Sequence, residues 1–184
     1  DGGSGVGILL ELARQFNIKS PEIGIDIILF DAEDYGQPEK SDFQTMKDSW
    51  CLGSQHWAKN PHKSNYIARY GILLDMVGAK NATFFWEETS TYFAKQIVEK
   101  VWKKASDLGF GNHFIYQDVP AIMDDHFYVN NLAHIPTIDI IEYNPSTKSH
   151  FNKHWHTHAD DMNNIDKSTL LAVGQTLLEV IYYE

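Results

Sequence analysis

The sequence YGILLDMV, residues 70–77, is a run of apolar side chains interrupted by a single acidic residue, Asp75. Such a run is typical of a strand that is buried on both faces of a parallel sheet. IDIILF, at residues 25–30, has the same character, and a further strand is predicted at residues 137–141, directly after Pro136. Together these segments predict a buried central sheet.

Amphipathic segments lie between and around the predicted strands. Apolar residues recur at helical spacing over residues 5–16 and 90–108, a shorter helix is predicted at residues 53–59, and a last one at residues 167–182. The alternation of helix and strand predicts an α/β three-layer sandwich, with a mixed, mostly parallel central sheet flanked by helices. In such folds the functional residues gather at the carboxyl ends of the strands.

The composition indicates a single domain over residues 1–184, with 43% apolar residues and a formal net charge of −10. The longest basic run is Lys103–Lys104, so a nucleic-acid partner is not expected. No apolar run approaches the roughly 20 residues that span a membrane. Cys51 is the only cysteine, which excludes an internal disulfide. The abrupt start on a loop signal leads us to expect the C-terminal part of a longer chain, with its N-terminal part missing.

The first residues, DGGSGVG, allow more than one interpretation. Glycines before a helix can cradle a phosphate, but here Asp1 leads the segment and no Lys-Ser or Lys-Thr pair follows it. The simpler alternative is an Asp that caps the helix. The segment alone therefore predicts a cap.

The segment FDAEDYG brings two adjacent carboxylates, Glu33 and Asp34, to the end of the predicted strand at residues 25–30. Neighbouring side chains of an extended segment point in opposite directions, so one carboxylate could bind a metal while the other faces a substrate. A cation would offset the cost of gathering like charges there. The alternative is a solvated acidic turn.

The segment HWHTHADD contains His154, His156 and His158 in alternation, with further acidic residues behind them. On an extended segment all three rings would share one face and could form a three-histidine site. We favour the alternative in which one histidine, His156, is a ligand and the others lie on the surface. With the carboxylates above, and with Asp75 and Asp124, this pattern predicts a divalent cation held by two carboxylates and one imidazole, which is typical of catalytic zinc.

Six segments, taken in this order, resemble one family of enzymes. They are DGGSGVGILLELAR, LFDAEDYG, LGSQHWA, YGILLDMVGAKNATFF, MDDHFYVNNLAHIPTIDII and WHTHADDMNNIDKSTL. The set is similar to the zinc exopeptidases of metallopeptidase family 28, which include leucyl-type aminopeptidases and glutaminyl-peptide cyclotransferases. The resemblance extends over almost the whole chain.

The resemblance implies a role for each matched residue. Asp1, Asp34 and His156 would be the metal ligands, and Glu33 would be the proton shuttle. The glycines of DGGSG would let the backbone turn tightly so that Asp1 faces the metal. One departure from the family pattern is Asp34, because the family commonly has the longer Glu there.

Two branches of the family differ in their reaction. In the aminopeptidase branch two zinc ions share the Asp1 position, Asp75 belongs to the second site, and Glu33 activates water. In the cyclase branch one zinc polarises the amide of an N-terminal glutamine, Glu33 carries a proton from the amine to the leaving ammonia, and Asp75 and Asp124 form an acidic pair. A third possibility is a non-catalytic domain of the same fold that only binds partners.

The resemblance favours the cyclase branch. Trp155, just before the histidine ligand, fits its pocket wall, the segment LLDMVGAKNATF is similar to that branch, and Asp139 and Phe127 are further candidates for lining the pocket. The implied substrates are peptide or protein N-termini, with catalytic residues Glu33, Asp75 and Asp124. Because the family is often exported, we expect a periplasmic or secreted protein.

Overall fold

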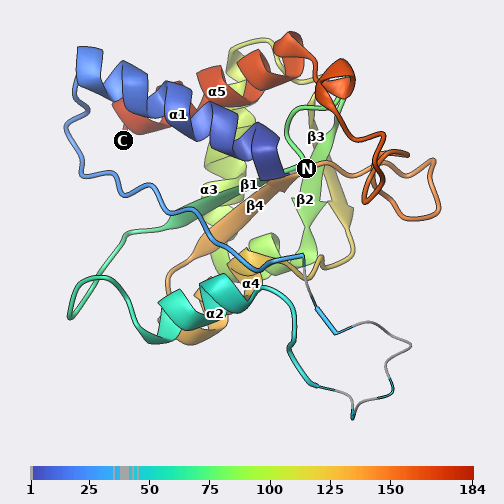
Figure 1. Ribbon diagram of the computed structural model, residues 1–184. Coiled ribbons are helices and arrows are strands. Elements are labelled where there is room, and N and C mark those ends of the chain that lie inside the picture. Colours follow the sequence, from blue (N-terminus) through green and yellow to red (C-terminus); the bar gives the residue numbers. More distant parts are fainter. Residues whose placement is uncertain (1, 35, 38–41, 43, 45) are drawn as a thin grey trace.

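The computed structural model describes residues 2–34, 36–37, 42, 44 and 46–184 (Figure 1). Its helices and strands follow one another in nearly the predicted order. They are α1 (Gly2–Ile18), α2 (Leu52–Lys59), β1 (Gly71–Asp75), β2 (Phe84–Glu87), α3 (Glu88–Asp107), β3 (Phe114–Val119), α4 (Asp125–Tyr128), a π-helical turn (Val129–Ala133), β4 (Thr137–Ile141), a 3-10 turn (Met162–Asn164) and α5 (Lys167–Tyr182).

The strands form two parallel pairs that meet at one point. β1 pairs with β4 from Gly71 opposite Thr137 to Asp75 opposite Ile141, and β2 pairs with β3. An antiparallel bridge between Phe84 and Glu142 joins the start of β2 to the end of β4. The predicted α/β fold with a mixed, mostly parallel sheet is therefore confirmed.

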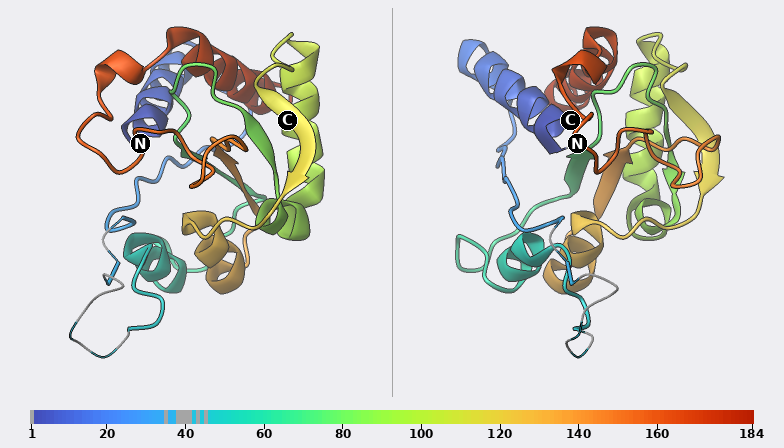
Figure 2. Two further views of the ribbon diagram at one scale, coloured as in Figure 1. Left: turned by 90° about the vertical axis from the view of Figure 1, so that its right-hand side faces the viewer. Right: turned by 45° about the vertical axis from the view of Figure 1, so that its right-hand side comes forward.

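The core lies between this sheet and the long helices. α1 and α5 run side by side, and α3 packs against β3 and β4 (Figure 2). Trp102 of α3 is 1% exposed, its ring meets Phe114 edge-on, and its Nε1 donates to the carbonyl of Ile115 at 3.1 Å. Because the indole N–H of Trp102 has an acceptor, burying the ring leaves no unsatisfied donor. The buried ring therefore stabilises the packing of α3 against the sheet.

Close contact between α1 and β1 explains one of the early glycines. A Cβ on Gly5 would lie 2.5 Å from the carbonyl oxygen of Leu74, so no other residue fits at this crossing. Ser4 Oγ accepts the N–H of Val77 at 3.0 Å and fixes the same contact. Gly2 and Gly3 belong to the helix as well, so the tight glycine turn expected here is wrong. A Cβ on Gly2, Gly3 or Gly7 would have open space, so close packing explains Gly5 alone among these glycines.

The prediction of a strand at residues 25–30 is wrong. This segment is extended, but within the described part of the chain it has no strand partner. Ile25, Ile27 and Leu29 are 36%, 40% and 58% exposed, whereas a strand buried on both faces would hide them. The apolar pattern indicates that a segment would fit into a sheet. A strand forms only where a neighbouring strand supplies the backbone hydrogen bonds.

Other predicted elements are confirmed, and two strands were missed. The helix at 167–182 and the strand at 137–141 have the predicted bounds, and the helices at 53–59 and 90–108 agree within two residues. β2 has only four residues, and β3 buries only its first and last side chains. Neither short strand carries enough alternation to be seen in the sequence. No helix among the described residues is long and apolar enough to cross a membrane.

Candidate active site

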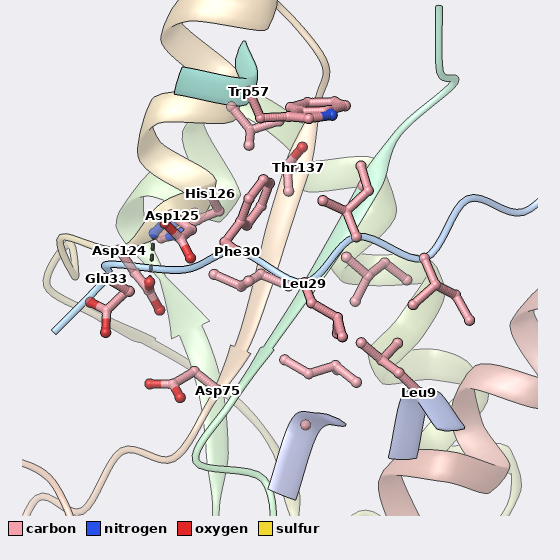
Figure 3. A pocket seen from close by; sticks show the side chains of 18 of the residues that line it. Leu9, Leu29, Phe30, Glu33, Trp57, Asp75, Asp124, Asp125, His126 and Thr137 are labelled. Atoms are coloured by element: carbon pink, nitrogen blue, oxygen red, sulfur yellow. Dashed lines mark hydrogen bonds between the residues drawn. The ribbon is translucent and has the colours of Figure 1, made fainter. Parts of the chain in front are cut away.

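A cavity of about 460 Å³ opens beside β1 (Figure 3). One end is acidic and the other apolar, and each end gathers residues from several elements. The carboxyl groups at one end belong to Glu33, Asp75, Asp124 and Asp125, and the other end carries Leu9, Leu29, Phe30 and Trp57. A pocket of this kind suits a small organic group that carries polar atoms at one end.

The start of α2 holds the loop that carries the first carboxylates. Three successive N–H groups, at residues 51–53, donate to the carbonyls of residues 31–33 at 3.0–3.1 Å. A Cβ on Gly53 would lie 2.3 Å from the carbonyl oxygen of Asp31, so this close approach requires glycine. The free N–H groups of a helix start thus fix the loop.

Glu33 lies at the acidic end in contact with two other groups. One atom each of Glu33, Cys51 and Asp124 lie within 4.8 Å of one another, and the Cys51 thiol donates to Glu33 Oε1 at 3.7 Å. Burial raises the pKa of Glu33 to about 8, and the neighbouring carboxylate Asp34 adds to the effect. A half-buried carboxyl group with a raised pKa can both take and give a proton near neutral pH.

Asp34 and His156 meet across 122 positions of sequence. His156 Nε2 lies 2.9 Å from Asp34 Oδ1, and their side chains are 36% and 42% exposed. His156 has a φ of 56°, and the Trp155 ring stacks on it with 4.0 Å between centroids. A carboxylate beside an imidazole at an accessible rim is a donor set that zinc prefers, so these residues fit the metal. The third predicted ligand, Asp1, lies outside the described residues.

The other two histidines of this segment are not part of a described metal cluster. The chain turns at residues 152–157 instead of extending, with backbone hydrogen bonds from Trp155 to Asn152 and from Thr157 to His154. The alternation of the histidines therefore does not place them on one face. Among the described residues, no group of metal-ligating atoms contains His154 or His158.

Asp75 and Asp124 lie close enough to interact electrostatically. Asp75 ends β1, and Asp124 caps α4 by accepting the N–H of Asp125 at 2.5 Å. Burial raises the pKa of Asp75 to about 6. Burial, with the charge of Asp75 next, raises the pKa of Asp124 well above its usual range. Carboxyl groups packed in this way bind protons more strongly than free carboxyl groups do.

A model of peptidase family M28 matches residues 1–181. The chain belongs to this family. The resemblance to metallopeptidase family 28 is therefore confirmed. The Asp34–His156 pair, which suits zinc, agrees with membership of this family.

The relatives that this chain matches are described either as glutaminyl cyclases or as zinc-dependent exopeptidases. The chain is 28% identical over 194 residues to a glutaminyl-peptide cyclotransferase of Dictyostelium discoideum, with 88% of this chain and 47% of the relative covered. The structure of Tannerella forsythia glutaminyl cyclase matches all of this chain and 63% of its own, with 59% identity and a TM-score of 0.95. A Zn-dependent exopeptidase of Parabacteroides distasonis matches at 61% identity and a TM-score of 0.96, with 100% of this chain and 63% of that one covered. This M28 chain thus spans about half to two thirds of these relatives.

Three residues predicted to contact substrate lie outside the lining of the acidic cavity. Asp139 is 1% exposed within 4.8 Å of Asp124, and Phe127 packs edge-on against Tyr128. Trp155 lines a second cavity of about 430 Å³, together with Met76 and Glu142. Asp139 is buried behind Asp124, so the structure does not bring it to the cavity surface, and its predicted role stays a prediction. The roles of Trp155 and Phe127 stay predictions.

The sequence interpretation missed Glu87 and gave His126 no role of its own. His126 Nε2 lies 3.0 Å from Glu87 Oε1, and the two side chains are 0% and 1% exposed. Burial alone would raise the pKa of Glu87, but hydrogen bonds from His126 and Ser90 lower it to about 2. Glu87 caps α3 by accepting the N–H of Thr89 at 2.9 Å, but Glu is not one of the usual cap residues, so the sequence carries no clear signal for this role.

Proposed function

We propose that the protein is a zinc-dependent glutaminyl-peptide cyclotransferase, which converts an N-terminal glutamine to pyroglutamate and releases ammonia. The observation that carries this proposal is that Glu33 lies within 4.8 Å of the buried carboxyl group of Asp124, next in sequence to the Asp34 that meets His156. Support comes from the 59% identity to Tannerella forsythia glutaminyl cyclase.

Asp1, Asp34 and His156 are the residues that would hold zinc in this proposal. When bound, the metal supplies positive charge that polarises the γ-amide carbonyl of the substrate. One imidazole and two carboxylates leave a position for that oxygen. The number of ions is part of the proposal: one for a cyclase.

Glu33 moves the proton in the proposed reaction. Its carboxylate accepts a proton from the α-amine as the amine nitrogen attacks the γ-amide carbon. A C–N bond then closes the ring, the bond to the amide nitrogen breaks, and Glu33 returns the proton so that neutral ammonia leaves. The raised pKa of Glu33, about 8 in the structure, suits a group that must work in both directions.

The remaining groups orient the substrate. Asp75 and Asp124 offer acceptor oxygens to the amine and amide N–H groups, and the apolar end of the cavity, at Leu29 and Phe30, offers apolar contacts to the rest of the substrate. No external nucleophile is needed, because both reacting groups belong to one residue. Holding that residue folded therefore supplies much of the rate advantage.

A second candidate is an aminopeptidase with two zinc ions. It is favoured by relatives described as a Zn-dependent exopeptidase and as a leucine aminopeptidase precursor, the latter 53% identical to this chain. In that reaction Asp75 would bind the second ion and Glu33 would activate water. Asp75 would then have to be ionised, against the direction in which burial moves its pKa.

Mass spectrometry of one peptide distinguishes the two reactions. The complete, zinc-loaded protein is incubated with a peptide that begins with glutamine. Loss of one ammonia from an intact peptide is the expected result, and release of free glutamine would establish the aminopeptidase instead. A matched peptide with an acetylated α-amine is the control, since its nitrogen cannot attack. If neither product forms, the enzymatic proposal is wrong.

A further inference from the structure

A line of buried polar groups runs from the active site into the core. Its members are Asp124, Asp139, His126 and Glu87, all 5% exposed or less. His126 Nε2 lies 3.0 Å from Glu87 Oε1, and His126 Nδ1 lies 3.6 Å from Asp139 Oδ2. Single atoms of Asp124, His126 and Asp139 lie within 4.8 Å of one another. Only the Asp124 end of this line carries a residue assigned to the reaction.

These four groups come from three parts of the fold. Glu87 ends β2 and caps α3, His126 lies in α4, Asp139 is in the middle of β4, and Asp124 caps α4. Ser90 Oγ accepts the backbone N–H of Asp139 at 2.8 Å and ties the α3 start to β4. The line therefore crosses the contact between three elements and cannot move independently of them.

Glu87 is the fixed negative end of the line. Besides His126, it accepts N–H groups from Thr89, Ser90 and Ile122. A carboxylate with this many donors stays ionised although it is buried. His126 must then carry a proton on Nε2, which leaves Nδ1 turned toward Asp139.

The opposite end of the line cannot be fully ionised. Asp139 and Asp124 are adjacent buried carboxyl groups, and the neighbouring charges from other elements are Asp75, Asp125 and Glu33, all acidic. Two such groups share at least one proton. Which of the two carboxyl groups carries that proton depends on whether His126 Nδ1 faces Asp139 as a hydrogen-bond donor or as an acceptor.

We propose that Glu87 and His126 are positioning residues, which act through Asp139 to fix the orientation of the Asp124 carboxyl group at the acidic end of the active site. Neither Glu87 nor Asp139 lines the cavity, so neither touches substrate. The inference rests on the proposed function, because it assigns Asp124 to the reaction. Carboxylate–histidine support of an active residue is a known device around metal sites, and its loss there costs about 10- to 100-fold.

The test uses Glu87→Gln in the complete, zinc-loaded protein. We expect kcat for the glutamine peptide to fall about 10- to 100-fold, with KM within about twofold of the wild type and zinc content unchanged. Asp139→Asn is the second variant, because it interrupts the line but leaves the α3 cap in place. Equal kcat in both folded variants and the wild type would overturn the proposal.

Matched controls separate positioning from loss of structure. His113 is also buried, and its Nδ1 bonds the carbonyl of Ala82 away from the cavity. Glu142 is a buried carboxyl group that takes no part in the line. We expect His113→Asn and Glu142→Gln to keep kcat within about twofold. If these controls lower kcat as much as Glu87→Gln does, the role is structural and the proposal is wrong.

Nitrogen-15 NMR of labelled histidine supplies a readout that needs no activity. We expect His126 Nε2 to carry a slowly exchanging proton in the wild type, and its signal to shift in Glu87→Gln. An unprotonated Nε2 in the wild type would overturn the proposal whatever the kinetics are. If the wild type releases free glutamine instead of ammonia, the proposed function fails alone, and the same variants are compared on that product.

Discussion

Two carboxylate–imidazole pairs in this molecule have almost the same contact distance and opposite surroundings. Asp34 and His156 approach to 2.9 Å at a rim where about two fifths of each side chain is exposed. Glu87 and His126 approach to 3.0 Å in the core, where both are at most 1% exposed. The chemistry of the two pairs is the same, so burial and the neighbouring groups must decide what each can do.

The difference is one of access. The rim pair can open toward an ion, because water and ions reach both partners, and the next residue, Glu33, offers a proton acceptor. In the core pair both side chains are buried, and Glu87 is held by the N–H groups of Thr89 and Ser90 in the helix cap, so the pair is suited to fixing orientation instead of binding an ion from solvent. A search for functional residues by type alone would not separate the two pairs.

The largest expected effect comes from breaking the rim pair. His156→Ala should lose zinc and lower kcat/KM by about 10³-fold or more, because an imidazole ligand is removed from the proposed metal site. Metal analysis and the ammonia-release assay check both effects. His158→Ala is the matched control on the same loop, where the side chain is exposed. Zinc loss in His158→Ala as well would favour the three-histidine site.

A comparable loss of rate, without loss of metal, is expected at the neighbouring residue. Glu33→Gln keeps the size of the side chain but cannot carry a proton, so kcat should fall about 10²- to 10⁴-fold. Zinc content should equal that of the wild type. Turnover retained in this variant would remove Glu33 from the proton path. The exposed Glu22→Gln is the control and should leave kcat unchanged.

These two pairs also mark what the sequence could predict. Asp34 and His156 were predicted to act together from flanking patterns and family resemblance, and the structure brings them into contact. Nothing in the sequence around Glu87 or around His126 predicts that these two side chains meet. Their contact depends on how β2 lies against α4, which no local pattern contains.

Whether a neighbouring strand is present explains both the correct strand prediction and the wrong one. Residues 70–77 and 25–30 have similar apolar runs, but only the first has a strand beside it in the described structure, β4. An apolar pattern indicates that a segment would be stable as a strand in a sheet. Whether the strand forms depends on a partner strand that is remote in sequence. Exposed side chains such as Leu29 therefore line a cavity instead of a sheet.

We expect substitutions in the Glu87–His126 pair to lower mainly the free energy of unfolding, and substitutions in the Asp34–His156 pair to lower mainly the activity. Glu87→Ala leaves His126 without its carboxylate and removes the cap of α3, and loss of one partner of a buried pair costs about 3–5 kcal/mol. Urea unfolding of wild type and variant measures the free energy of unfolding. Glu11→Ala breaks an exposed ion pair with Arg14 and should leave the free energy of unfolding nearly unchanged. Equal effects would contradict the comparison.

The smallest effect concerns Glu142, a buried carboxyl group with no imidazole partner. Its side chain is 4% exposed, and Oε2 has no hydrogen-bond partner among the described residues. Burial raises its pKa to about 7, whereas the His126 hydrogen bond lowers that of Glu87. The folded protein therefore binds a proton at Glu142 more strongly than the unfolded chain does.

The sign of the pH dependence follows from that difference. Because the pKa of Glu142 is raised on folding, its contribution is most favourable below about pH 4.5 and is lost as the pH rises toward about 7. Glu142→Gln should remove this part of the slope and, at pH 8, exceed the wild type in free energy of unfolding by about 1–3 kcal/mol. Urea unfolding of both proteins from pH 4 to 8 measures the difference. A constant difference across this range would show that burial without an imidazole partner does not shift the proton affinity of this carboxyl group, and the contrast with Glu87 would then rest on helix capping alone.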